Sequence, residues 1–188
     1  MMEGRAGGRG RAGGSTRVTK TDGVNRFVWD VRGQQGILMP PGAYQARLKV
    51  GDTTATQPLI VRIDPRLAAD GVTDADLREQ YEHNVRMRDL IEAVNRVAAR
   101  LRDAQSRFRN ATGAEAETAK KVTAVAAKVF TEPVRYGKPG IQAHITYLAG
   151  MTTSVDQKIG RDAIERYQVL KKELDGISAE LDRILGGR

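Results

Sequence analysis

Few side chains in this 188-residue chain could do chemistry, and those few are scattered. The two histidines, His83 and His144, could serve as metal ligands or as a general base. Neither has a second histidine at ligand spacing, and a metal site needs three or four converging ligands. On helical stretches such imidazoles commonly lie at the surface or at the edge of a bundle. We therefore expect no metal site at either histidine.

The other polar residues indicate no catalytic constellation. Carboxylates alternate with Lys and Arg along the expected helices, which is typical of solvated faces rather than of paired acids in a cleft. No serine lies in a nucleophile elbow, the glycines match no phosphate-binding loop, and the absence of cysteine excludes disulfides and thiolate chemistry. We expect a protein that is not an enzyme, with no catalytic, cofactor-binding or metal-binding residues and no cofactor.

Two aromatic residues, Trp29 and Tyr44, remain as candidates for binding. Together they could form a surface on which a sugar or a peptide stacks. A lone Trp on a strand is more often the core anchor of a small β-domain, and this second interpretation is favoured.

Three expected strands would position these aromatics. Residues 24–31 are rich in β-branched and aromatic side chains. Residues 43–50 alternate between apolar and polar, a tight turn follows at Gly51 and Asp52, and a third strand runs to Ile63. Pro58 cannot donate to a neighbouring strand, so it must lie at a sheet edge or at a strand start. The alternation puts these side chains on one apolar face: Tyr44, Ala46, Leu48, Val50, Leu59, Val61 and Ile63.

Residues 73–188 predict an antiparallel helical bundle of three to four helices, two of them long. Thr73 is the expected N-cap of a helix to about residue 110, and the last helix starts near residue 161. Both long helices repeat apolar residues in steps of three and four, as in a coiled coil. The first seam is Met87, Leu90, Val94, Val97, Leu101, Ala104 and Phe108, extended by Leu77, Tyr81 and Val85. The second is Ile164, Tyr167, Leu170, Leu174, Ile177, Leu181 and Ile184.

Shorter helices are expected at 114–131 and from residue 140. The fold class is therefore α+β, mostly α: a small three-stranded antiparallel Ig-like β-region followed by the bundle. The predicted domains are a Gly/Arg-rich arm at 1–20, the β-region at 21–66, a linker at 67–72 and the bundle at 73–188.

The net charge of +8 is concentrated in the arm, where five basic residues and one acidic residue supply half of it. We expect residues 1–20 to be disordered, because they offer little to bury. The remaining residues carry mixed charges, so no nucleic-acid partner is expected except through the arm. No apolar run approaches the ~20 residues of a membrane span, and no signal peptide is expected.

Two stretches, residues 27–30 and 38–48, together resemble a known signature. Phe-Val-Trp-Asp, followed by Leu-Met-Pro-Pro-Gly-Ala-Tyr-Gln-Ala-Arg-Leu, is similar to the W-D…P-x-G-x-Y-x-x-R-L pattern of an Ig-like domain. That domain occurs in bacterial flagellar hook-capping proteins and in C-terminal sorting domains of secreted proteins. The resemblance implies that Trp29 and Tyr44 face one core.

A longer resemblance covers roughly residues 22–185. Several stretches look like the C-terminal region of large bacterial sortilin-like, sialidase-repeat β-propeller proteins, which are often labelled glycosyl hydrolases. These stretches are residues 23–32, 56–59, 64–66, 88–90, 93–96, 139–140 and 180–182. The propeller of that family, the part that could carry glycosidase-like activity, is absent from this chain. The segment from Gly33 to Met39 is also shorter than the insert that is usual there. The resemblance implies an accessory role and a periplasmic or extracellular location.

Two functions are therefore open. One is a structural or interaction module, an accessory part of a propeller-type secreted protein or its stand-alone descendant. The other is a basic-armed nucleic-acid-binding protein. For the first, the expected partner is a protein or a propeller domain, bound through an exposed β-face or edge, because three strands bury one face only if something covers it.

Overall fold

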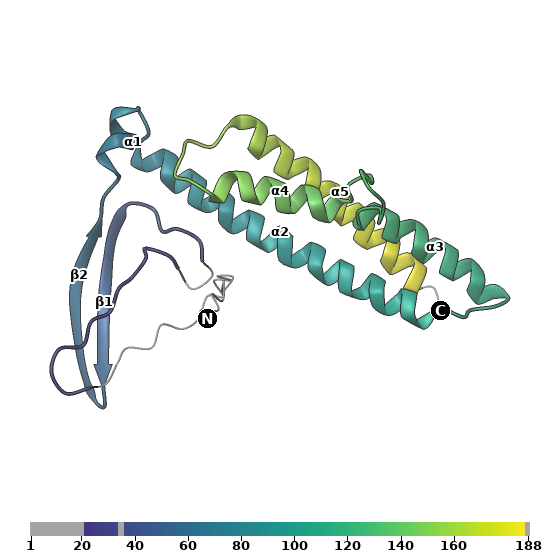
Figure 1. Ribbon diagram of the computed structural model, residues 1–188, viewed down its shortest axis with the longest axis horizontal. Coiled ribbons are helices and arrows are strands. Elements are labelled where there is room, and N and C mark those ends of the chain that lie inside the picture. The colour runs from purple at the N-terminus through teal and green to yellow at the C-terminus, as the bar shows by residue number, and fades with distance from the viewer. Residues whose placement is uncertain (1–20, 34–35, 187–188) are drawn as a thin grey trace, which may run out of the picture. The chain divides into compact units, whose positions relative to one another are not determined.

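The computed structural model describes residues 21–33 and 36–186. Within this part the chain divides into two compact units at residues 39 and 40. The expected coarse class, α+β with mostly helix, is confirmed. The elements, in order, are β1 (Gly42–Val50), β2 (Thr53–Val61), α1 (Pro65–Ala69), α2 (Asp74–Arg107), α3 (Ala114–Val129), α4 (Ile141–Thr153) and α5 (Arg161–Gly186) (Figure 1).

β1 and β2 form an antiparallel hairpin, as the alternating pattern predicts. The register runs without a bulge from Val50 opposite Thr53 to Gly42 opposite Val61. Gly51 opens the two-residue turn with φ of 59°, and the residue after it has no positive φ. This is a type II′ turn, in which glycine at the first position avoids the cost that a side chain would meet.

The expected third strand, residues 24–31, does not form, and in the described part of the chain the sheet has two strands. Val24 is 96% exposed and Val28 is 66% exposed, and Val31 has φ of 60°, which interrupts an extended backbone. The pairing described for residues 21–39 is a single bridge between Arg32 and Leu38. Composition favours a strand here, but a strand also requires a ladder of backbone pairs, and among the described residues this segment forms none.

The helix starts follow their capping residues. Asp64 caps α1 and binds Arg66, which lowers the pKa of Asp64 to about 2. α1 covers residues 65–69, so it spans the end of the predicted β-region (21–66) and the start of the predicted linker (67–72). Thr73 caps α2 with a full capping box: its hydroxyl accepts from the Asp76 N–H, and the Asp76 carboxylate accepts from the Thr73 N–H.

The helical bundle consists of three rods, and the middle rod is made of two helices in line, α3 followed by α4 (Figure 1). α2 and α5 are the two long helices that the sequence predicts. His83 lies against Tyr167, and further along both helices Arg100 pairs with Asp182 at 2.6 Å. Because later residues of α2 contact later residues of α5, the two helices run parallel.

The middle rod runs in the opposite direction. Gln80 of α2 binds the end of α4 at Thr152, whereas Asn95 binds Gln142 near the start of α4. The order of contacts is therefore reversed along α4. Consecutive rods are antiparallel, and the two long helices lie parallel as the first and third rods of the bundle.

The break between α3 and α4 falls at residues 130–140, where Pro133 and the following turn stop α3 as predicted. Gly140 then begins α4 against the end of α3: a Cβ at this position would lie 2.3 Å from the Val129 carbonyl oxygen. Only glycine permits so close an approach of two backbones.

The predicted seams form the core. On α2 and at its C-cap the residues from Met87 to Phe108 that were expected inward are all buried. On α5 the five central positions, Tyr167, Leu170, Leu174, Ile177 and Leu181, are buried, and the two end positions are half-buried. The middle rod completes the core with Val122, Val125, Ala126, Val129, Ile141, Ile145 and Leu148.

The first turns of α2 differ from the expectation. Tyr81 and Val85 are only half-buried, and the buried positions are instead Gln80, His83 and Asn84. The spacing of three and four residues continues from Met87 back through these polar residues. The same side of α2 therefore stays buried, but its side chains change from apolar to polar. Of the helices described here, none has the length and apolarity needed to cross a membrane.

Candidate interaction surface

The hairpin is the candidate interaction surface, because its two faces carry different side chains. Residues that lie opposite each other in an antiparallel pair point to the same face. Tyr44 is opposite Leu59, and Leu48 is opposite Ala55, so six of the seven predicted apolar side chains share a face. The seventh, Ile63, was expected on the third strand but lies beyond the end of β2 at Val61. We call this the apolar face; it carries Tyr44, Ala46, Leu48, Val50, Ala55, Leu59 and Val61, with Thr53 and Gln57. The other face carries Ala43, Gln45, Arg47, Lys49, Thr54, Thr56, Pro58 and Ile60.

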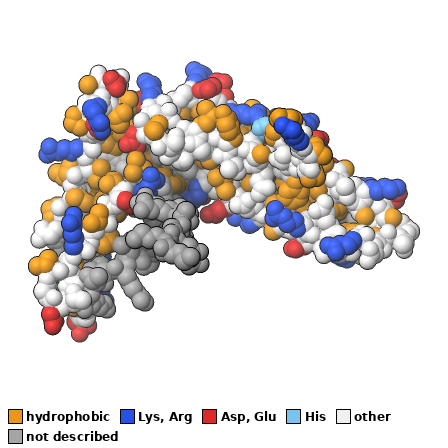
Figure 2. Space-filling view, viewed as in Figure 1, with side chains coloured by type: hydrophobic (Ala, Val, Ile, Leu, Met, Phe, Trp, Pro, Cys, Tyr) orange, Lys and Arg blue, Asp and Glu red, His pale blue; other side chains and the backbone are white. Residues whose placement is uncertain are grey.

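The apolar face is open to solvent over most of its length. Leu48 is 56% exposed, Val50 is 67% exposed and Leu59 is 39% exposed. Figure 2 shows hydrophobic side chains at the surface of the hairpin, with Lys and Arg between them. In the described part of the chain, therefore, the helices leave most of this face uncovered.

The base of the hairpin is better protected than its tip. Pro41 is buried and Tyr44 is half-buried. The Tyr44 hydroxyl donates to the Pro40 carbonyl at 2.5 Å, which closes the turn that leads into β1. Burial raises the pKa of the Tyr44 phenol, and the neighbouring Tyr81 of α2 acts in the same direction. The tyrosine of the P-x-G-x-Y stretch thus fixes its own local turn.

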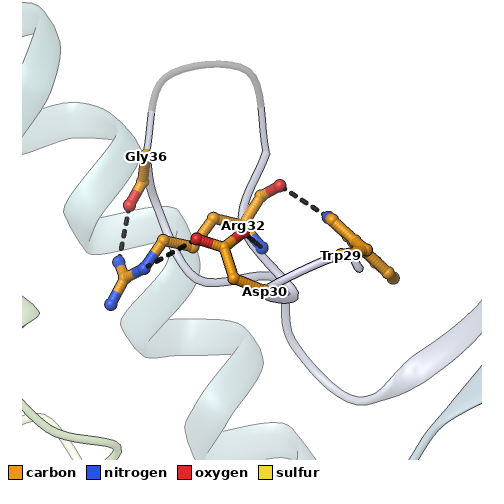
Figure 3. A network of polar contacts seen from close by, with 4 residues as sticks. All are labelled: Trp29, Asp30, Arg32 and Gly36. Atoms are coloured by element: carbon orange, nitrogen blue, oxygen red, sulfur yellow. Dashed lines mark hydrogen bonds and ion pairs between the residues drawn. The ribbon is translucent and has the colours of Figure 1, made fainter. Parts of the chain in front are cut away.

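Trp29 has a similar local role in the first unit. Its indole N–H donates to the Arg32 carbonyl at 2.8 Å, and the Arg32 guanidinium donates to the Gly36 carbonyl at 2.6 Å (Figure 3). Asp30 accepts from the Arg32 backbone N–H at 3.3 Å. These bonds hold a loop together. Trp29 is half-buried, so it is neither the buried core anchor that was favoured nor a fully exposed stacking surface.

The two histidines lie in different surroundings. His144 is exposed on α4, as expected. His83 is fully buried in the bundle, which corrects the expectation of a surface or bundle-edge position. Its ring lies edge-on to Tyr167, with centroids 6.0 Å apart, and neither ring nitrogen has a hydrogen-bond partner among the described residues. Burial lowers the pKa of His83, and the nearby Arg86 lowers it further.

Sequence reasoning missed a set of buried amides beside His83. Gln80 donates to the carbonyls of Thr152 and Val155 and accepts from the Gln157 N–H, and Asn84 donates to Thr152. These contacts tie the α4–α5 connection to α2. The available signal was the spacing: stepping back from Met87 by three and four reaches Asn84 and Gln80.

A groove of about 430 Å³ lies between α4 and α5. Its lining includes His144, Tyr147, Met151, Gln157, Asp162 and Arg166. Tyr147 is 71% exposed and Met151 is 53% exposed, so the groove is shallow on the α4 side. It brings no second histidine or carboxylate pair to His144.

Within residues 21–33 and 36–186, no three His, Asp or Glu side chains converge as a metal site. The sequence-based candidates are thus not assembled into one chemical site: His83 is in the core, His144 lies on a groove, and Trp29 and Tyr44 each hold a local turn. Comparisons of this chain with family models, with curated proteins and with solved structures find no match.

Proposed function

We propose that this chain is a non-catalytic interaction module that docks a protein partner through its hairpin. The observation that carries the proposal is the uncovered apolar face of β1 and β2, on which Leu48 and Val50 are more than half exposed. An isolated two-stranded sheet is marginally stable in water, and it gains stability when its apolar side is covered. A partner that covers the apolar face would therefore stabilise the hairpin.

The chemistry of the hairpin favours a protein over a nucleic acid as partner. Its one cationic pair, Arg47 and Lys49, lies on the face opposite the apolar one. Nucleic-acid surfaces usually concentrate several basic residues on a single folded face. An apolar face of aromatic, branched and small side chains is instead suited to packing against another sheet or domain.

The resemblance noted in the sequence supports the same role. In this proposal the chain is an accessory C-terminal part of a propeller-type secreted protein, or a stand-alone descendant of one, acting in the periplasm or outside the cell. The hairpin would then be part of an Ig-like sheet to which a partner supplies further strands. Support comes from two contacts at the signature residues: the Trp29 indole N–H binds the Arg32 carbonyl, and the Tyr44 hydroxyl binds the Pro40 carbonyl. Each residue of the signature thus holds the loop or turn in which it lies.

Hydrogen exchange tests the docking role directly. In dilute protein that sedimentation shows to be monomeric, amides of residues 43–61 should exchange rapidly while the core of α2 and α5 stays protected. Slow exchange throughout the hairpin in a verified monomer would mean that the chain covers its own sheet, and the proposal would be wrong.

Binding of the apolar dye anilinonaphthalene sulfonate gives a second readout with a matched control. Leu48→Ser should lower dye binding because it interrupts the apolar face. Val169→Ser, at a similarly exposed position on α5, should leave it unchanged. Equal effects of the two substitutions would show that the hairpin offers no continuous apolar surface.

A further inference from the structure

The outer edge of β1 carries an uninterrupted row of backbone donors. In a hairpin closed by a two-residue turn, the pair next to the turn, Val50 and Thr53, is hydrogen-bonded, and pairs alternate from there. The N–H groups that point away from β2 therefore belong to Ala43, Gln45, Arg47 and Lys49. These residues are exposed, and no backbone hydrogen bond from another described segment reaches them.

The outer edge of β2 is not equivalent. By the same alternation its outward positions are Thr54, Thr56, Pro58 and Ile60. Pro58 has no N–H, so a strand added along β2 would lose a bond in the middle of the ladder. Pro58, expected at a sheet edge or at a strand start, lies at the edge, and β1 is the better edge for strand addition.

We propose that the edge of β1 pairs with β1 of a second copy of this chain, antiparallel, about a two-fold axis at Ala46. This inference rests on the proposed function, because it takes the hairpin to be a docking element, and it adds a second copy of the chain at the edge of β1. Pairing of identical edges is a closed, isologous contact, so it ends at a dimer with a four-stranded sheet.

The placement of charge selects this register. With Ala46 on the axis, Gln45 lies opposite Arg47 of the second copy, and Ala43 lies opposite Lys49. All four outward residues are then paired, and no two like charges are directly opposed. Sliding by one pair in one direction sets Arg47 against Arg47, and sliding in the other leaves Lys49 without a partner. The register with the most hydrogen bonds is thus also the one that keeps the basic residues from facing each other.

The apolar face is matched in the same register. Tyr44 lies opposite Leu48 of the second copy, and Ala46 lies opposite Ala46, so large side chains alternate with small ones across the axis. Opposed residues share a face, so the two apolar faces join into one, twice as wide. The dimer keeps this joined face available for the partner domain of the proposed function.

A single cysteine tests the axis, because the natural chain has none. In Ala46→Cys the two cysteines would form a non-hydrogen-bonded pair with Cα atoms about 4.5 Å apart, within disulfide range. Leu48→Cys is the matched control on the same exposed face. Its two cysteines would be four residues apart along the strands, ~14 Å, too far to bridge. We expect Ala46→Cys to form a disulfide-linked dimer under mild oxidation at least tenfold faster than Leu48→Cys. Equal rates overturn the register.

Proline substitutions test the edge without a cross-link. Gln45→Pro removes one outward donor of β1, and Thr56→Pro removes one outward donor of β2; neither removes a bond inside the hairpin. Sedimentation equilibrium should show at least tenfold weaker self-association for Gln45→Pro and no change for Thr56→Pro. A natural chain that stays monomeric at high micromolar concentration overturns the inference, as does equal weakening by both prolines.

Hydrogen exchange at several protein concentrations, together with the cross-linking of Ala46→Cys, separates this inference from the proposed function. If the hairpin exchanges rapidly at every protein concentration and Ala46→Cys does not cross-link, self-pairing is wrong while docking of a different protein stands. If the hairpin exchanges slowly in a monomer, both are wrong. Protection of residues 43–49 that rises with protein concentration supports self-pairing.

Discussion

The side-chain amide of Gln80 on α2 donates to the backbone carbonyl of Thr152 at the end of α4, at 2.8 Å, across a buried contact. The same amide also serves the carbonyl of Val155 and the N–H of Gln157. One glutamine therefore binds three backbone groups, one in the last turn of α4 and two in the connection to α5. Buried backbone groups that lose such a partner destabilise the folded state.

We predict that Gln80→Ala lowers the free energy of unfolding by about 1–3 kcal/mol, because the Val155 carbonyl and the Gln157 N–H lose this partner, while Asn84 still donates to the Thr152 carbonyl. Urea unfolding followed by circular dichroism measures the change. Gln142→Ala is the control: its amide binds Asn95 at an exposed position, and the cost should stay within about 0.5 kcal/mol. Equal costs for the two variants would show that the α4–α5 connection does not depend on Gln80.

The second prediction concerns pH. The lowered pKa of His83 means that the folded protein prefers the neutral imidazole, with Arg86 and Tyr167 as its charged and titratable neighbours. The unfolded chain therefore binds more protons below about pH 6.5, and stability should fall as the pH drops through that value.

His83→Leu should remove this pH dependence between about pH 7.5 and 5.5, because the buried titrating group is gone. His144→Gln, at the exposed histidine, is the control and should keep the slope. Unfolding free energies at several pH values measure both. A slope that His83→Leu leaves intact would assign the pH dependence to other groups.

Periodicity predicted the long helices well, because apolar residues such as Leu101 and Leu174 recur at the spacing that a buried helical stripe requires. It failed at Gln80 and His83, because these residues occupy the same geometric seam with polar side chains, and a search for apolar residues passes over them. Their burial depends on partners in the α4–α5 connection and on α5, more than 70 residues away for Gln80.

The strand at 24–31 failed for a different reason. Phe27 and Val28 have strong strand propensity, but propensity does not supply a neighbouring strand, and both are at least half exposed. The hairpin was predictable because its turn, its alternation and its pairing are all local. The apolar face was likewise predictable from Tyr44 and Leu48, and an exposed face was expected for so small a sheet. How far the helices cover that face depends on their packing, which the strand sequences alone do not show.

The third prediction tests the two seams. Leu101 and Leu174 are almost completely buried in the shared core, and Leu→Ala at either should cost about 2–5 kcal/mol by leaving a cavity. Val169→Ala, on α5 but 53% exposed, should cost less than about 0.5 kcal/mol. Chemical denaturation measures all three. A cost below about 0.5 kcal/mol at both leucines would be incompatible with a joint core.

The fourth prediction addresses residues 1–20, which lie outside the described residues. Their sequence offers few apolar side chains, so packing them on the body would lose chain entropy with little burial in return. Cutting the chain at Ser15 should therefore leave the melting temperature within about two degrees. A large fall in the melting temperature would show that the arm packs against the folded body.

The same arm decides between the two functions left open by the sequence. Residues 1–20 hold half of the net charge of +8, so they supply the main sequence-independent attraction for phosphates. If the chain is an interaction module, any binding to a short DNA duplex should be weak, should fall steeply with salt and should be lost when residues 1–20 are deleted. Fluorescence anisotropy at two salt concentrations measures this, with hydrogen exchange of the hairpin as the control that the body is unchanged. DNA affinity that survives the deletion would place a nucleic-acid surface on the folded body and would favour the basic-armed protein over the docking module.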